Sequence, residues 1–115
     1  MKSILILEPH DAMRAVLVHI VRDLGYETQT EAVGDWSVAR VDAILVDPSH
    51  PASRETARVL RSLFPELPIV CVSVLAPGPD VVDELAPVAC LSKPFELAQL
   101  ESALTTAVAA GASRV

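Results

Sequence analysis

The sequence lacks a long apolar run, although 51% of its 115 residues are hydrophobic. A membrane-spanning helix needs about 20 consecutive apolar residues. The first apolar segment, in MKSILILEPH, is ended by Glu8, Pro9 and His10. It is too short for a secretory signal peptide, and no small-residue cleavage site follows it. We therefore predict a cytoplasmic protein without a membrane span, and its length suits one compact domain.

Basic clusters and aromatic residues are also scarce. Aromatic residues make up 3% of the sequence, and 15 acidic residues outnumber 9 basic ones, for a formal net charge of −6. Surfaces that bind nucleic acid need clustered positive charge, whereas the arginines here are scattered. Direct binding to nucleic acid is therefore disfavoured. Proteins, metal ions and cationic groups suit an acidic domain better.

Only two cysteines are present, and both lie among apolar residues, Cys71 in Val-Cys-Val and Cys90 in Ala-Cys-Leu. Their spacing is not that of a metal site such as CxxC. We expect both to be small core residues. A disulfide between them is disfavoured in a reducing compartment.

Short apolar segments alternate with segments of helical periodicity along the chain. The predicted strands cover residues 4–7, 26–30, 43–46, 69–73 and 88–91. The predicted helices cover residues 13–24, 53–63, 80–85 and a final segment from 95 or 96 to 109. Asp11 is the expected N-cap of the first helix and Gly25 its stop, and Ser53 is the expected N-cap of the next.

Residues 31–42 carry the weakest pattern, and only residues 37–40 could form a short helical turn there. A shortened or missing second helix would expose one side of the neighbouring strands. Trp36 stands at that place, and two interpretations are open. It covers the gap, or it anchors a partner, since tryptophan is enriched in binding hot spots.

Strands that alternate with helices and are apolar on both faces predict a parallel sheet covered on both sides. Two doubly wound strand orders are common, the dinucleotide-binding type and the flavodoxin-like type. The first requires a glycine-rich turn after the first strand, and the turn here reads EPHD. We therefore predict an α/β, flavodoxin-like, five-stranded sheet of order 2-1-3-4-5 over residues 1–110, followed by a flexible tail at 111–115.

Polar residues stand at the carboxyl ends of four predicted strands. Glu8 follows the first strand, Asp47 the third and Lys93 the fifth, and Ser73 ends the fourth. Singly, each has an ordinary explanation as a loop or turn residue. In a parallel sheet, however, the carboxyl ends line one crevice, so an acid, an acid, a hydroxyl and an ammonium are expected to converge. That convergence favours a functional site.

Three segments, ILVDPSHP, PIVCVS and LSKPF, resemble sequence motifs of a known protein family. From residue 4 to about 109 the chain resembles the receiver domains of bacterial response regulators. The resemblance implies that Asp47 accepts a phosphoryl group from the phosphohistidine of a histidine kinase. It implies that Ser73 hydrogen-bonds a phosphoryl oxygen and that Lys93, before a commonly cis Pro94, pairs with the phosphoryl group. Mg²⁺ would be held by Glu8, Asp47 and the backbone carbonyl of Ser49.

The resemblance also implies partners. These are a histidine kinase or a phosphotransfer protein, and a downstream protein or output domain. A homodimer through the short helix at 80–85, the fifth strand and the last helix is a further expectation. Such a domain is not an enzyme, beyond Mg²⁺-dependent self-phosphorylation and autodephosphorylation.

Several positions depart from the family pattern. Pro9 stands where a second metal-binding acid is usual, so we expect weak Mg²⁺ binding, with Asp11 either a substitute ligand or an N-cap. Val74 replaces a small residue and could crowd the acceptor, and Leu75 is apolar where some members orient a water. Cys90 replaces the aromatic residue that moves with the switch hydroxyl.

Three functions therefore remain in view. The first is a phosphoacceptor module that acts through Asp47. The second is a pseudo-receiver that keeps the fold as a protein-interaction module without phosphorylation, with a Lys93–Asp47 ion pair as a structural remnant. The third is an aspartyl phosphohydrolase with His50 as its base, which is the least favoured because the DxD pattern of such enzymes is absent.

Overall fold

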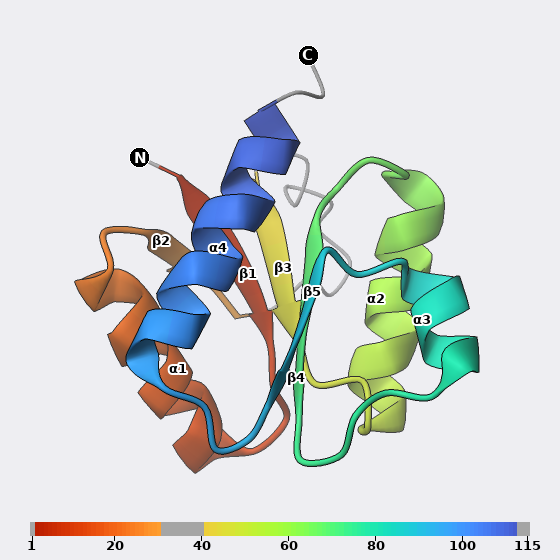
Figure 1. The fold of residues 1–115 in the computed structure, drawn as a ribbon, viewed down its shortest axis with the longest axis horizontal. Helices are drawn as coiled ribbons and strands as arrows, with labels where there is room; N and C mark the ends of the chain where they lie inside the picture. The colour runs from red at the N-terminus through yellow and green to blue at the C-terminus, as the bar shows by residue number, and fades with distance from the viewer. Residues whose placement is uncertain (1, 31–40, 113–115) are drawn as a thin grey trace.

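Five parallel strands form one sheet of order β2-β1-β3-β4-β5 in the computed structural model, which describes residues 2–30 and 41–112 (Figure 1). This confirms the predicted flavodoxin-like order. The strands are β1 (Ser3–Leu7), β2 (Glu27–Gln29), β3 (Ala43–Val46), β4 (Ile69–Ser73) and β5 (Ala89–Ser92). The helices are α1 (Asp11–Asp23), α2 (Pro51–Leu63), α3 (Pro79–Leu85) and α4 (Leu97–Ala112). The predictions for a short second helix and for Trp36 lie outside the described residues.

Helices cover both faces of the sheet, with α1 and α4 on one side and α2 and α3 on the other (Figure 1). The strands β1, β3 and β4 each supply both cores, because successive side chains of a strand point to opposite faces. In β1, Leu5 packs with the α2 and α3 side, whereas Ile4 and Ile6 pack with α1 and α4. The strands β1, β3 and β4 are buried along their whole length, as their apolar runs predict.

The strand β5 lies at the edge of the sheet and is only half covered. Its burial alternates along the strand, and Cys90 is exposed. The prediction that both cysteines are core residues is therefore wrong for Cys90, because the outward face of an edge strand has no helix over it at this position. Cys71 is buried, and it is the register partner of Cys90 across β4 and β5.

The starts of two helices differ from the predictions. The N-caps are His10 and His50, and neither makes a side-chain cap hydrogen bond. Asp11 is instead the first residue of α1, where its carboxylate still interacts favourably with the helix dipole. Ser53 is buried in the first turn of α2, because Pro51, whose φ angle suits a first helical position, starts that helix earlier.

The ends of two helices depend on glycines in different ways. Gly25 follows α1 with φ of +99°, a conformation that favours glycine, so the predicted stop is confirmed. Gly111, in contrast, lies buried inside α4, which runs to Ala112 rather than stopping at residue 109. A Cβ on Gly111 would lie 2.9 Å from the backbone oxygen of Asp42, so glycine allows this helix to approach the backbone at the amino end of β3. Within residues 2–30 and 41–112, no helix is long and apolar enough to cross a bilayer.

Replacement of Gly111 by alanine should destabilise the protein, against the usual trend for helices. Alanine in a helix interior is favoured over glycine by about 1 kcal/mol. Here the added methyl group meets backbone, and we expect Gly111→Ala to lower the free energy of unfolding by about 1–3 kcal/mol. Urea unfolding followed by circular dichroism measures the change. Thr105→Ala, at an exposed position of α4, is the control and should be neutral or stabilising. A stabilised Gly111→Ala protein would contradict the close approach.

The two thiols should differ sharply in reactivity. Burial, with a smaller contribution from Cys90, raises the pKa of Cys71 to about 12, so its reactive thiolate is scarce. At pH 8 we expect a thiol reagent to label Cys90 alone in the folded protein and both cysteines after unfolding. Intact mass counts the labels. The Cys90→Ser protein should remain unlabelled while folded, and rapid labelling of that variant would show that Cys71 is accessible.

Candidate functional site

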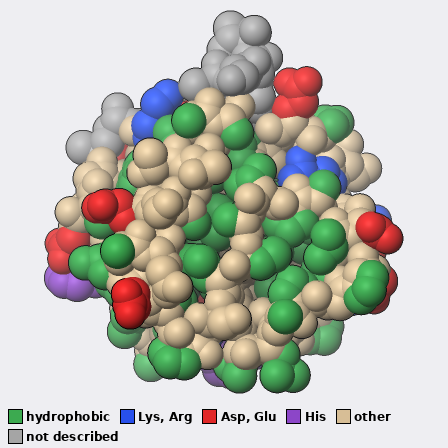
Figure 2. Space-filling model, viewed as in Figure 1, with side chains coloured by type: hydrophobic (Ala, Val, Ile, Leu, Met, Phe, Trp, Pro, Cys, Tyr) green, Lys and Arg blue, Asp and Glu red, His purple; other side chains and the backbone are tan. Residues whose placement is uncertain are grey.

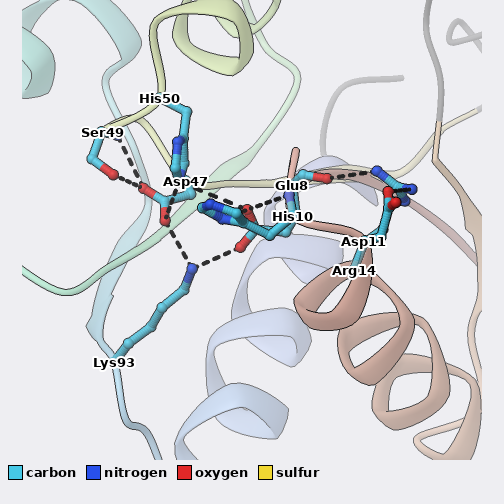
Figure 3. A network of polar contacts seen from close by, with 8 residues as sticks. All are labelled: Glu8, His10, Asp11, Arg14, Asp47, Ser49, His50 and Lys93. Atoms are coloured by element: carbon cyan, nitrogen blue, oxygen red, sulfur yellow. Dashed lines mark hydrogen bonds and ion pairs between the residues drawn. The ribbon is translucent and has the colours of Figure 1, made fainter.

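Three of the residues predicted to form the site meet at the carboxyl edge of the sheet. Lys93, after β5, places its Nζ atom 2.7 Å from Oε1 of Glu8 and 2.8 Å from Oδ2 of Asp47 (Figure 3). The side chains of Glu8 and Asp47 are 1% and 3% exposed, and that of Lys93 is 12% exposed. A single ammonium therefore joins two buried carboxyl groups that come from different strands.

Backbone pairing that continues past the strand ends places these side chains. The amide of Asp47 donates to the carbonyl of Leu7 at 3.3 Å, and the amide of Lys93 donates to the carbonyl of Ser73 at 2.8 Å. The register of the sheet thus fixes where each polar side chain leaves the backbone. The apolar runs of the strands set that register, because a slip by one residue would turn the core residues to the other face.

Asp47 has hydrogen-bond donors on both carboxylate oxygens. Its Oδ1 atom accepts from the amide of Ser49 at 3.0 Å and from the Ser49 hydroxyl at 2.5 Å, while Oδ2 accepts from Lys93. Burial alone would raise the pKa of Asp47, but the hydrogen bonds from Lys93 and Ser49 outweigh it and hold that pKa below its ordinary value. Asp47 is therefore an anion at neutral pH, with the oxygen lone pairs that a nucleophile needs.

Lys93 keeps its charge for the reciprocal reason. Burial disfavours the ammonium, but the hydrogen bonds to Asp47 and Glu8 prevail and raise the pKa of Lys93. The site therefore holds a fixed positive charge next to the Asp47 carboxylate. Pro94 follows Lys93 through a cis peptide bond, as the family likeness implied.

Ser73 reaches the same edge, but its hydroxyl is not hydrogen-bonded to Asp47. It donates instead to the backbone carbonyl of Leu75, within the loop that follows β4. The next two side chains, Val74 and Leu75, are 70% and 79% exposed. The loop thus presents apolar groups to solvent, and the hydrogen bond of the Ser73 hydroxyl is made within this loop.

Two histidines complete the cluster. From the sequence, no site role was expected for His10, and His50 was expected only as the base of the least favoured function. The Nδ1 atom of His10 lies 3.6 Å from Oε2 of Glu8. The Nε2 atom of His50 lies 3.9 Å from that oxygen and 3.6 Å from Oδ2 of Asp47. The two rings meet edge to face, with centroids 4.6 Å apart (Figure 3). A signal was present in the sequence, because each strand-end acid is followed by proline and then, within two residues, by histidine.

Asp11 stands apart from the cluster. Its side chain is 92% exposed and lies 2.5 Å from Nη2 of Arg14, which donates through Nη1 to the backbone carbonyl of Glu8 (Figure 3). Asp11 is therefore neither the side-chain cap of α1 nor a neighbour of Asp47. Its negative charge is taken up by Arg14, and the expectation that it could replace the missing metal ligand is wrong for this structure.

The residues fit a divalent cation, but they fit Mg²⁺ only in part. Mg²⁺ prefers six oxygen ligands in octahedral geometry. The oxygen donors expected for it are carboxylates of Glu8 and Asp47, which Lys93 already bridges, and the carbonyl of Ser49. Pro9 adds no donor. The group of described residues that could hold a metal ion is instead Glu8, His10 and His50, whose ligand atoms all lie within 4.8 Å of one another.

Comparison with known proteins gives the fold. No family model and no curated protein matches the chain. The receiver domain of a sensor histidine kinase from Pseudomonas aeruginosa is 26% identical, with 94% of this chain and 98% of that chain covered and a TM-score of 0.73. That domain carries a magnesium ion in its active-site cleft.

Two further solved structures agree with it. A receiver domain protein from Methanospirillum hungatei has a TM-score of 0.81 at 18% identity, with 100% of this chain and 99% of that chain covered. A chemotaxis protein from Vibrio cholerae has a TM-score of 0.76 at 24% identity, with 93% and 98% covered. The chain therefore has the fold of these domains along nearly its whole length.

Loss of the bridging ammonium should destabilise the protein strongly. In a Lys93→Met variant the buried carboxylates of Glu8 and Asp47 lose their shared partner, and we expect the free energy of unfolding to fall by about 3 kcal/mol. Chemical denaturation at neutral pH gives the value. Adding Asp47→Asn to that variant should restore part of the loss. Lys2→Met, at an exposed lysine 3.9 Å from Asp42, is the control and should change little. Equal losses in both lysine variants would argue against a stabilising cluster.

Proposed function

We propose that this chain, which has the fold of response-regulator receiver domains, is a phosphoacceptor module of a two-component phosphorelay. A carboxylate oxygen of Asp47 attacks the phosphorus of a phosphohistidine, the phosphorus–nitrogen bond breaks, and the histidine of the donor protein leaves. The donor is a histidine kinase or a phosphotransfer protein. The observation that carries the proposal is the buried, ionised Asp47, held by Ser49 and next to the ammonium of Lys93.

The charges at the site suit this transfer. Phosphoryl transfer depends mainly on positioning and on stabilising the charge of the transferred group. A phosphoryl group brings about −1.5 to −2 charges at neutral pH. Lys93 offsets part of that charge, and it can turn from the Asp47 carboxylate to the phosphoryl oxygens without leaving Glu8. The rest calls for a divalent cation, and we propose weak Mg²⁺ binding by Glu8, Asp47 and the Ser49 carbonyl.

The Ser73 hydroxyl is the proposed sensor of the phosphoryl group. To donate to a phosphoryl oxygen it must release the carbonyl of Leu75, so the loop after β4 changes with it. The exposed Val74 and Leu75 side chains lie on that loop. Cys90 is too small to act as the aromatic lever of other receivers, and the loop itself is therefore the proposed route of the signal.

The output surface is proposed to comprise α3, β5 and α4. Figure 2 shows hydrophobic side chains gathered on the face that carries these elements. Large apolar side chains exposed on or beside them include Val82, Val88 and Leu97. A downstream protein, an output domain or a second copy of the chain would bind there, in the cytoplasm and without direct contact to nucleic acid. No enzymatic activity is proposed beyond Mg²⁺-dependent self-phosphorylation and autodephosphorylation.

One observation favours a second function. Lys93 already satisfies both Glu8 and Asp47 without any cation, and none of the buried side-chain polar atoms in the described residues lacks a hydrogen-bond partner. A cluster closed in this way is what a pseudo-receiver needs, that is, a domain that binds its partner without phosphorylation. The two functions share the fold and the partner surface and differ in whether Asp47 reacts.

Phosphorylation of Asp47 is tested directly by intact mass. With Mg²⁺ and acetyl phosphate, or with a phosphorylated histidine-containing donor protein, we expect the wild-type chain to gain the mass of one phosphoryl group. Asp47→Asn should gain none, because an amide is a poor nucleophile for phosphorus. Asp42→Asn, a carboxylate at the opposite end of β3, is the matched control and should still react. No added mass with either donor would establish the pseudo-receiver in place of the phosphoacceptor.

A further inference from the structure

We propose that Glu8, His10 and His50 form a binding site for a first-row transition-metal dication such as Zn²⁺. This site binds Zn²⁺ more tightly than Mg²⁺. The inference concerns the same edge of the sheet as Asp47, but it goes beyond phosphoryl transfer and does not require it. Its basis is the geometry around a single oxygen atom, Oε2 of Glu8.

The two oxygens of Glu8 have different neighbours. Oε1 accepts the ammonium of Lys93 at 2.7 Å, whereas Oε2 faces His10 at 3.6 Å and His50 at 3.9 Å (Figure 3). Both distances to the imidazoles exceed that of a hydrogen bond between nitrogen and oxygen. Oε2 accepts only a long hydrogen bond, at 3.5 Å, from the backbone amide of His10, and neither imidazole is hydrogen-bonded to it. This leaves a space bounded by two nitrogens and one oxygen.

The spacing of these atoms is close to that of a tetrahedral metal site. Zinc bonds of about 2.0–2.1 Å to nitrogen and oxygen place neighbouring ligand atoms about 3.3–3.5 Å apart. The observed separations from Oε2 are a few tenths of an ångström longer, and the three ligand atoms lie within 4.8 Å of one another. The His10 side chain is 68% exposed, so its ring has room to shift toward Oε2 of Glu8. Two histidines and one glutamate, with a fourth position for water, form a common zinc ligand set.

The surroundings of Glu8 orient it for this role. Lys93 fixes the carboxylate through Oε1, as outer-shell partners of metal ligands commonly do, and the Glu8 side chain is only 1% exposed. The helices α1 and α2 begin immediately after His10 and His50, which fixes the backbone at both ligands. The positive ends of these helices oppose a cation, but Oδ2 of Asp47, 3.6 Å from Nε2 of His50, adds negative charge beside the site.

The same geometry discriminates against Mg²⁺. Imidazole nitrogen suits Zn²⁺, Ni²⁺ and Cu²⁺, whereas Mg²⁺ prefers oxygen ligands alone. An ion held by oxygens of both Glu8 and Asp47 must compete with the ammonium of Lys93, which occupies the space between them. An ion on the histidine side of Glu8 leaves both hydrogen bonds of Lys93 intact. The two kinds of cation therefore require different rearrangements.

The site is tested on the full chain, purified without a histidine tag and stripped of metal. Titration with Co²⁺ should produce the intense visible absorption of a tetrahedral nitrogen- and oxygen-ligated ion, saturating at one ion per chain. Calorimetric titrations with Zn²⁺ and Mg²⁺ compare affinities directly. We expect Zn²⁺ to bind at least about a hundredfold more tightly than Mg²⁺, because only Zn²⁺ uses the imidazoles well.

Matched variants locate the binding. His10→Ala and His50→Ala should each weaken Zn²⁺ binding at least about tenfold, since each removes one of three ligands. His19→Ala, at the third histidine of the chain, which is exposed and paired with Asp23, should leave it unchanged. Cys90→Ser should also retain binding, which excludes the exposed thiol as the metal ligand. Unchanged Zn²⁺ affinity in both His10→Ala and His50→Ala, or no preference over Mg²⁺, would overturn the proposal.

The outcome is separable from that of the phosphorylation experiment. Asp47→Asn cannot accept a phosphoryl group, but it keeps Glu8, His10 and His50, so it should bind Zn²⁺ with an affinity within about tenfold of wild type. Zn²⁺ binding by that variant supports the metal site whether or not Asp47 reacts in the wild-type chain. Complete loss of Zn²⁺ binding in Asp47→Asn would show that the metal belongs to the acceptor site instead, and would refute a separate site.

Discussion

The ammonium of Lys93 allows two carboxyl groups to remain buried at the carboxyl edge of the sheet. Glu8 and Asp47 would repel each other in an environment with little water, and the desolvation of each is unfavourable. Lys93 stands between them at hydrogen-bond distance from both. The order of the strands makes this arrangement possible, because the polar residues that follow β1, β3 and β5 lie at the same edge of the sheet. The ionised state of Asp47 and the orientation of Glu8 both follow from that contact.

The sequence predicted the sheet and the three strand-end residues well, for a physical reason. Apolar runs such as that before Asp47 define strands, and parallel strands bring their carboxyl ends together, so the meeting of distant residues follows from topology alone. Helix starts were predicted less well. Asp11 and Ser53 are favoured N-cap types, but in α2 the proline at position 51 already sets the first turn, and in α1 Arg14 binds the carboxylate of Asp11.

The meeting of the two histidines beside Glu8 was missed because periodicity carries no information about loops. His10 and His50 meet only because two short turns, EPH and DPSH, leave neighbouring strands and enter α1 and α2 with similar geometry. The predicted strand order already placed the fifth strand at the edge of the sheet, but the apolar neighbours of Cys90 do not show which face of that strand is left uncovered. Ser73 is likewise a hydroxyl residue at the predicted strand end, yet its hydroxyl donates to the backbone carbonyl of Leu75, two residues further along the chain.

The bond between Lys93 and Glu8 joins residues 85 positions apart in the chain, and that between Lys93 and Asp47 spans 46. Closing such long loops is entropically unfavourable until the intervening strands are in place. We therefore expect the ion cluster to form late in folding, after the transition state has assembled most of the sheet. Contacts that form after the transition state hold back unfolding and leave the folding rate nearly unchanged. Lys93 would thus slow the unfolding of the finished domain without being needed for the assembly of its sheet.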